Sequence, residues 1–325
     1  MNNIRTDLAI EAAALYNKTP EDVEKLDGVK VTTQEIESVK ITHVEVTNKN
    51  GEEAIGKQIG NYVTIECPKI RDNDEDAFKA TSNALAQELK KILKLKKDST
   101  VLAVGLGNWN VTPDALGPKV ISNLMITRHL FEYVPEYLDD GTRPVCAISP
   151  GVLGLTGIET SEITKGIVDM IKPDVIIAID ALASRKTDRI STTIQIADTG
   201  ITPGSGIGNK RKSLDESYLG VPVIAIGVPT VVDAATVAND TIELLIENIS
   251  KYAKSDSVMN QIADGFDFEH RYPLIKEVLT PYVGELIVTP KEVDGIIEEV
   301  SKIIANGIND AVLGESDLST SQKPL

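Results

Sequence analysis

Four short apolar runs in the middle of the chain have the composition of strands that are buried on both faces. They consist mainly of Val, Ile, Leu and Ala, and segments with helical spacing of apolar residues lie between or after them. This succession predicts an α/β fold with a doubly wound, mostly parallel sheet and helices on both faces. A further strand is expected at residues 194–197. The four runs are Val101–Gly107, Val145–Ser149, Val175–Asp180 and Val223–Val228.

The segment that precedes these runs has a different pattern. Residues 29–70 alternate charged and β-branched side chains around Asn48–Gly51. That alternation predicts exposed antiparallel strands joined by a hairpin turn, and therefore an appended antiparallel β subdomain. Asn73 or Asp74 is then placed to cap a helix that ends near Leu95.

The last third of the chain is predicted to be helical. An apolar stripe from Val231 to Ile249 indicates a helix directly after the last buried strand. Two more helices are expected beyond residue 254, followed by a polar, frayed tail. We expect one catalytic domain overall, divided into an N-terminal segment at 8–28, the β subdomain at 29–70, an α/β core at 71–253 and C-terminal helices with the tail at 254–325.

The charge and cysteine content narrow the class of protein. The chain carries 33 Lys and Arg against 49 Asp and Glu, a net charge of -16, which opposes binding to nucleic acid or to an anionic membrane. Cys67 and Cys146 have no metal-ligand spacing and fit a reducing compartment. No stretch approaches the roughly 20 apolar residues of a membrane span. We therefore expect a cytoplasmic protein without a direct nucleic-acid or membrane partner.

Familiar cofactor and metal motifs are incomplete in this sequence. Gly105 and Gly107 follow a strand, but Asn110 occupies the position of the third glycine in a dinucleotide fingerprint. Residues 51–57 spell G-x-x-x-x-G-K, yet Gln58 replaces the Ser or Thr that would hold magnesium. We therefore expect no cofactor. No paired spacing suggests a zinc site among the three histidines, which are His43, His129 and His270.

Two aspartates are the candidates for catalytic chemistry. Asp114 lies in the loop after the first buried strand, and Asp180 ends the very apolar run VIIAID. In open α/β sheets the site lies beyond the carboxyl ends of the strands, where such loops converge. Spacing alone leaves an alternative open, in which Asp114 is a turn or capping residue and Asp180 bonds loop amides.

Four segments, in order along the chain, are VGLGNWNVTPDALGPKV, ISPGVLGLTGIET, VIIAIDALASR and DTGITPGSGIGNKRKSL. They resemble the signature stretches of the germination protease family, whose members are spore endopeptidases that degrade small acid-soluble spore proteins. The resemblance implies that Asp114 and Asp180 are the essential aspartates, that the subunits form a homotetramer, and that the fold is related to hydrogenase-maturation endopeptidases. Those relatives bind a metal through two carboxylates and a histidine, and none of the four segments contains a histidine.

The resemblance also implies a cleavage site near the N-terminus. Family substrates are cut after the acidic residue in a pattern like Thr-Glu-(Ile or Phe)-Ala-x-Glu, and Thr6–Glu11 fits that pattern. Since family members are made as zymogens, residues 1–7 are expected to be a propeptide, cut between Asp7 and Leu8. The alternative is that Thr6 or Asp7 caps a helix, and both functions can hold at different stages.

A cut after an acidic residue implies a basic subsite. Cations that lie near the signature segments are the candidates for this subsite, although a short basic run is equally typical of a solvated surface loop. The candidates are Lys210, Arg211, Lys212, Arg185 and Lys186.

A mechanism follows as a hypothesis. Two carboxyl groups that are close together share one proton, so the ionised member activates a water and the protonated member polarises the peptide carbonyl. The expected protein is thus a self-processing endoprotease of the spore core that starts the degradation of spore proteins. Two other functions stay open: a metal-dependent endopeptidase with the same aspartates as ligands, and a non-catalytic α/β binding protein.

Overall fold

The computed structural model describes residues 6–16, 26–72, 74–139, 141–204, 211–252 and 268–313. Within these ranges the chain has an α/β fold in which nine strands form one mixed sheet, in the order β1-β2-β3-β7-β8-β6-β4-β5 with β9 beside β8. The strands are β1 (Val29–Ile36), β2 (Val39–Val46), β3 (Gly60–Glu66), β4 (Val101–Gly105), β5 (Val145–Ile148), β6 (Val175–Ser184), β7 (Thr193–Ala197), β8 (Val223–Asp233) and β9 (Ile287–Val288).

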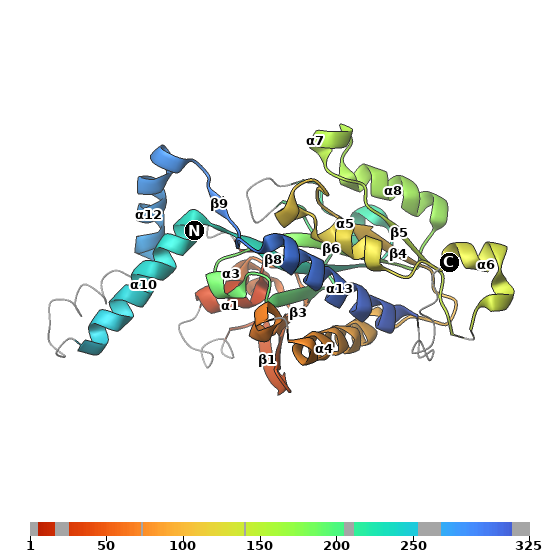
Figure 1. Ribbon diagram of the computed structural model, residues 1–325, viewed down its shortest axis with the longest axis horizontal. Coiled ribbons are helices and arrows are strands. Elements are labelled where there is room, and N and C mark those ends of the chain that lie inside the picture. The colour runs from red at the N-terminus through yellow and green to blue at the C-terminus, as the bar shows by residue number, and fades with distance from the viewer. Residues whose placement is uncertain are drawn as a thin grey trace.

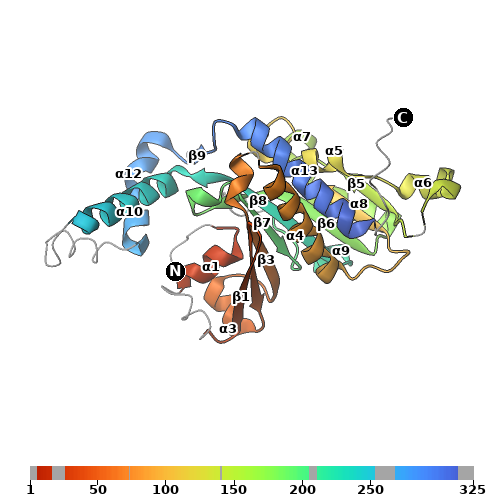
Figure 2. The same cartoon turned by 60° about the horizontal axis from the view of Figure 1, so that its bottom comes forward.

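Helices cover both faces of this sheet (Figures 1 and 2). On one face, α4 (Glu75–Leu93), α5 (Leu116–Asn123) and α13 (Val293–Val312) pack on the strands. On the other face lie α1 (Ala9–Tyr16), α3 (Lys49–Ile55), α8 (Thr160–Ile171) and α9 (Glu216–Leu219). The remaining helices are α6 (Arg128–Tyr133), α7 (Leu153–Thr156), α10 (Ala234–Tyr252) and α12 (Phe268–Val283), with single 3₁₀ turns η1 (Pro68–Asp72), η2 (Thr112–Asp114), η3 (Pro135–Tyr137) and η4 (Thr187–Arg189).

The predicted buried strands are present and form the parallel part of the sheet. β4 pairs in parallel with both β5 and β6, and β6 pairs in parallel with β8. The antiparallel strands β1, β2 and β3 continue the same sheet, because β3 pairs with β7 and β7 pairs with β8. The strand predicted at residues 194–197 is β7.

Two local predictions were wrong. The hairpin turn expected at Asn48–Gly51 is instead the start of α3, because the Asn48 side chain caps that helix by accepting a hydrogen bond from the Gly51 N–H at 3.0 Å. The actual hairpin joins β1 to β2 at Glu37, which has a φ of 54°. The helix predicted from Val231 begins only at Ala234, because β8 extends to Asp233. The predicted cap at Asp74 is confirmed, since it accepts from two N–H groups of α4.

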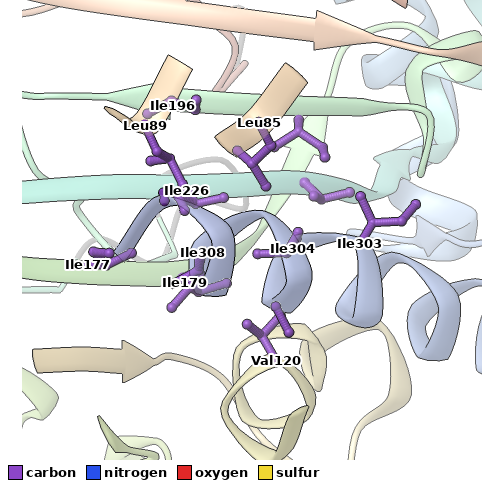
Figure 3. Close-up of a cluster of buried hydrophobic side chains, with 14 of the residues drawn as sticks. Leu85, Leu89, Val120, Ile177, Ile179, Ile196, Ile226, Ile303, Ile304 and Ile308 are labelled. Atoms are coloured by element: carbon purple, nitrogen blue, oxygen red, sulfur yellow. The ribbon is translucent and has the colours of Figure 1, made fainter. Parts of the chain in front are cut away.

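The main core lies between the sheet and the pair α4 and α13. Ile304 and Ile308 of α13 extend toward side chains of β6 and β8 (Figure 3), and both are buried. At Gly307 the two helices approach closely, because a Cβ there would lie 2.7 Å from Leu85 Cδ2. The helix predicted in the C-terminal segment therefore completes the core of the whole domain.

α10 and α12 pack against each other and extend away from the sheet (Figures 1 and 2). Arg271 of α12 donates a hydrogen bond to Asn239 Oδ1 of α10 at 3.0 Å, which joins the two helices. Within the described ranges, every helix is too short or too polar to cross a lipid bilayer. Several large apolar side chains of this pair are exposed, namely Leu244, Leu245, Leu274, Val278, Tyr282 and Val283.

We expect Gly307→Ala to lower the free energy of unfolding by about 1 to 3 kcal/mol, because the added methyl group must displace the fully buried Leu85. Gly295→Ala is the matched control on the same helix, since no atom lies within 4 Å of a Cβ at Gly295. This control should be neutral or stabilising by up to about 1 kcal/mol. Urea denaturation measures both, and equal effects would contradict the close packing of α4 and α13.

Candidate active site

A cavity of about 410 Å³ lies at the carboxyl end of β4, where β6 and β8 continue beyond their neighbour. Both candidate aspartates line it, one from β6 and one from the loop after β4. Much of the remaining lining is apolar or belongs to the N-terminal segment. It includes Asp7, Leu182, Ala183 and Thr230. The structure therefore brings together Asp114 and Asp180, as the sequence predicted.

Asp180 lies inside β6 rather than at its end, so that detail of the prediction was wrong. The strand continues to Ser184 because β8 also continues and pairs with it beyond a register shift at Leu182. The Asp180 side chain is 6% exposed, and its Oδ1 accepts a hydrogen bond from the Ala181 N–H at 2.9 Å. Burial raises the pKa of Asp180 well above its usual range, and the negative charges of Asp114 and Asp7 raise it further.

Asp114 is held in place by a tight loop. Gly107 has a φ of 107°, and a Cβ there would lie 2.0 Å from the Asp114 carbonyl oxygen, so only glycine fits. The Asn108 N–H donates to Asp114 Oδ2 at 2.9 Å and to its main-chain oxygen at 3.0 Å. Partial burial raises the pKa of Asp114 to about 6, although the hydrogen bond from Asn108 opposes the rise.

The two carboxyl groups are electrostatically coupled. The charge of Asp114 is the second cause, after burial, of the raised pKa of Asp180. Ionising both groups is therefore unfavourable, and the pair titrates as a unit that holds one proton over a range of pH. Such a pair offers one base and one acid to a molecule in the same cavity.

The N-terminal segment lies in this cavity. The Asp7 N–H donates to the Ala183 carbonyl at 3.3 Å, and the Ala183 N–H donates to Asp7 Oδ2 at 3.0 Å. Leu8 and Ala9 are fully buried, and the predicted helix follows as α1. The side chain of Asp7 is thus bound to β6 three residues beyond Asp180.

Glu11 is the second acidic residue of the segment and is almost fully buried at 1% exposure. Its carboxylate accepts hydrogen bonds from the main-chain N–H groups of Arg185 at 2.8 Å and Lys186 at 3.1 Å. The Arg189 guanidinium lies 3.4 Å from the same carboxylate. Both acidic residues of the segment that matches the substrate pattern, Asp7 and Glu11, are therefore bound by specific hydrogen bonds.

The predicted basic subsite is only partly described. Lys210 lies outside the described residues. The Lys212 ammonium is on the surface and pairs with Glu162 at 2.8 Å, and the Arg211 N–H donates to the Pro203 carbonyl at 3.3 Å. Neither Arg211 nor Lys212 is among the described residues that line the cavity. Arg185 and Lys186 contribute main-chain N–H groups to the binding of Glu11, four residues after the predicted cut.

The possible metal ligands in the described part of the chain are scattered. The described residues contain no group of three His, Cys, Asp or Glu side chains that could hold a metal ion. The imidazole of His43 lies 3.5 Å from Glu88 on α4, and the cavity lining contains no histidine. The lining does contain a third carboxylate, that of Asp7, whose Oδ2 accepts a hydrogen bond from the Ala183 N–H at 3.0 Å.

Comparison with known proteins identifies the family of the chain. The germination protease family matches the chain at residues 9–272 and 254–323. The chain belongs to the germination protease family. It is 54% identical over 326 residues to the germination protease of Clostridium acetobutylicum, with 99% of each chain covered. Its identity to the germination protease of Bacillus subtilis is 44% over 343 residues, covering 95% of this chain and 93% of the relative.

Membership of the germination protease family confirms the resemblance seen in the four signature segments, and the chain is a peptidase. Sequence patterns did not identify three further residues that contact the N-terminal segment. Arg189 lies in η4, whereas Lys57 and Gln195 come from segments that have no catalytic motif. Only the docked position of the segment reveals them.

We expect Asp114→Asn to stabilise the protein at neutral pH. The pKa of Asp114 rises from 3.8 to about 6 on folding, so its ionisation opposes folding and stability falls as the pH increases between these values. A shift of this size corresponds to about 3 kcal/mol, reduced to about 1 to 2 by solvent screening of a half-buried group. Urea denaturation at pH 7 and near pH 4 measures the difference, which should shrink at the lower pH.

The control for this measurement is Asp169→Asn, which removes an exposed carboxylate paired with Lys165 on α8. This change should have little effect at either pH. A destabilised Asp114→Asn protein at pH 7, or a difference that does not depend on pH, would contradict the raised pKa.

Proposed function

We propose that this peptidase is the endoprotease that begins the degradation of small acid-soluble spore proteins, and that it acts in the cytoplasm of the spore core during germination. Asp114 and Asp180 are its catalytic residues. One observation carries the proposal: an N-terminal segment that matches the substrate pattern lies in the same cavity as both aspartates, with the Asp7 carboxylate bound to the Ala183 N–H.

The coupled aspartates supply the chemistry in this proposal. One carboxylate removes a proton from a water molecule as the water oxygen attacks the peptide carbonyl carbon. The carboxyl group that retains the shared proton passes it to the nitrogen of the departing amine. Because burial raises the pKa of both groups, the pair retains a proton at pH values where ordinary aspartates are ionised.

We further propose that the protein is made as a zymogen, with residues 1–7 as a propeptide that the enzyme removes itself. The cut falls between Asp7 and Leu8. The support is that the residues around this bond are held tightly, since Leu8 and Ala9 are fully buried and Glu11 is bound by two main-chain N–H groups. A spore-protein segment with the same pattern is proposed to use these contacts, and Lys210, Arg211 and Lys212 are proposed to bind its acidic residues.

The doubly wound layout and the division of the chain into a β subdomain at 29–70, a core at 71–253 and C-terminal helices belong to the same proposal. Its support is that α4, α5 and α13 cover one face of the parallel strands while α8 and α9 cover the other. In this arrangement the aspartates lie beyond the carboxyl end of β4, where ligands bind in open α/β sheets.

We expect the intact mass of the purified protein to fall by the mass of residues 1–7 during incubation at mildly acidic pH. Asp114→Asn and Asp180→Asn should each prevent the loss, because neither can then activate the water. Mass spectrometry over time gives the rate and the site of the cut together. Full activity of either variant would rule out the aspartate pair.

The same assay separates the two rival functions. Loss of cleavage in the presence of a chelator, with recovery on adding a divalent metal, would favour a metal-dependent peptidase that uses the aspartates as ligands. If the wild type neither trims itself nor cuts an acidic spore protein, a non-catalytic binding protein becomes the better interpretation.

We also propose that the subunits assemble into a homotetramer and that α10 and α12 take part in the contacts. The support is the row of exposed apolar side chains on this projecting pair, including Leu245 and Tyr282. Apolar patches of this kind on a soluble protein commonly mark interaction surfaces. Assembly would cover them.

Leu245→Lys together with Tyr282→Lys should therefore reduce the mass of the assembly measured by light scattering, because a charged side chain would be buried at the contact. Met170→Lys is the matched control, since Met170 is also exposed, at 83%, but lies on α8 away from this pair. An unchanged mass in the double variant would exclude α10 and α12 from the assembly contacts.

A further inference from the structure

Lys57 holds the main chain at the predicted cleavage site. It follows α3, where Gly56 in the left-handed conformation ends the helix. Its Nζ donates hydrogen bonds to the carbonyl oxygen of Asp7 at 2.9 Å and to that of Thr6 at 3.3 Å. The G-x-x-x-x-G-K match at residues 51–57 thus ends on a lysine that contacts peptide rather than phosphate.

Gln195 of β7 binds the same carbonyl group from a second direction. Its Nε2 donates to the Asp7 carbonyl oxygen at 3.0 Å, while its Oε1 accepts from the Ala9 N–H at 2.6 Å. The side chain is buried, and these two hydrogen bonds fix which end of the amide faces Asp7. Gln195 therefore bridges the two sides of the Asp7–Leu8 peptide bond.

The register of the sheet places Gln195 in line with the catalytic pair. Gln195 is opposite Gly227 of β8, and Gly227 is opposite Asp180 of β6. Residues opposite one another in a sheet point to the same face, and two strand spacings separate Gln195 from Asp180 by about 10 Å. Asp7 reaches from Gln195, which binds its carbonyl group, to Ala183 of β6, which binds its carboxylate three residues beyond Asp180.

The charge of Lys57 suits a carbonyl oxygen that becomes negative. Burial lowers the pKa of Lys57, while the nearby carboxylates of Asp7 and Glu11 oppose that change. A partly desolvated ammonium binds a neutral carbonyl oxygen only moderately, and the attraction becomes much stronger when that oxygen acquires negative charge. Two donors on one carbonyl oxygen, one of them an ammonium, are the arrangement that stabilises a tetrahedral oxyanion.

We propose that Lys57 and Gln195 form the oxyanion-binding pair for hydrolysis of the Asp7–Leu8 bond. This inference rests on the proposed function, in which that bond is cut by the aspartate pair. Water oxygen bonds to the Asp7 carbonyl carbon and gives one proton to a carboxylate, and the carbonyl electrons move onto the oxygen held by Lys57 and Gln195. The carbon–nitrogen bond then breaks as the Leu8 nitrogen takes a proton, leaving an Asp7 α-carboxyl group and a Leu8 amine.

The test is the first-order rate of self-cleavage in the full-length chain, followed by intact mass. Lys57→Met removes the ammonium and keeps the length of the side chain. Gln195→Glu removes the donor to Asp7 but keeps an acceptor for the Ala9 N–H. Each change should slow cleavage by about 100-fold or more, the usual loss for one oxyanion donor. Lys30→Met, which removes an exposed lysine paired with Glu45 on the outer strands, should cleave at the wild-type rate.

A second measurement distinguishes catalysis from docking. In an Asp114→Asn background, where no cut occurs, hydrogen exchange at the N–H groups of Arg185 and Lys186 reports whether Glu11 remains bound. Slow exchange together with slow cleavage supports the oxyanion role. The oxyanion role would be overturned if the cleavage rate fell only in proportion to the loss of protection from hydrogen exchange. In that case the two residues merely hold the segment in place.

The remaining outcomes are also decisive. Suppose that cleavage depends on Asp114 but that Gln195→Glu and Lys57→Met are cut at the wild-type rate. This result overturns the present inference and leaves the proposed function intact. A wild type that is never cut at Asp7–Leu8 overturns both. If Lys57→Met does not fold, Gln195→Glu alone decides, since it preserves the hydrogen bond to Ala9.

Discussion

A carboxyl group inside an apolar sheet is the constraint on which the site depends. Asp180 lies on a strand that has neighbours on both sides, and it is 6% exposed, so its charged form lacks the water that would stabilise it. The protein tolerates this group because burial raises its pKa well above the usual range, so that it holds a proton at pH values where an exposed aspartate is ionised. Proximity of Asp114 adds repulsion, and the tight loop at Gly107 keeps that second carboxyl group in place. The surrounding fold therefore holds the two carboxyl groups close together despite their electrostatic repulsion.

The N-terminal segment adds a third carboxylate to the same place. Asp7 raises the pKa of Asp180 further, so the electrostatic interaction between them opposes docking when both are ionised. Burial of Leu8 offsets this by about 1.5 to 3 kcal/mol, and the hydrogen bonds to Glu11 add to the binding. Docking of the segment and proton uptake by the aspartates are therefore linked, because each makes the other more favourable.

The sequence predicted the parts of this structure that depend on local pattern. Buried runs of Val, Ile and Ala indicated the parallel strands. The positions of Asp114, in the loop after one run, and of Asp180, at the end of another, indicated a pair at one edge of the sheet. Asn48 was misread because an asparagine before glycine fits both a turn and a helix cap, and only tertiary packing selects between them. Arg189, Lys57 and Gln195 could not be predicted, since their importance comes from the pairing of β7 with β8 and from the position of Asp7.

The acidic N-terminal segment docks on a chain with a net charge of -16, whose long-range field opposes the approach of another acidic group, so local donors must hold it. At Glu11 the main-chain N–H groups of Arg185 and Lys186 supply these donors, with one guanidinium nearby. Main-chain N–H groups bind a carboxylate with fixed geometry and carry no net charge that would also attract nucleic acid. A short segment that is both acidic and apolar fits this arrangement, since Leu8 must be buried while Asp7 and Glu11 meet separate donors. The described contacts thus hold the two acidic residues of this segment at a fixed spacing.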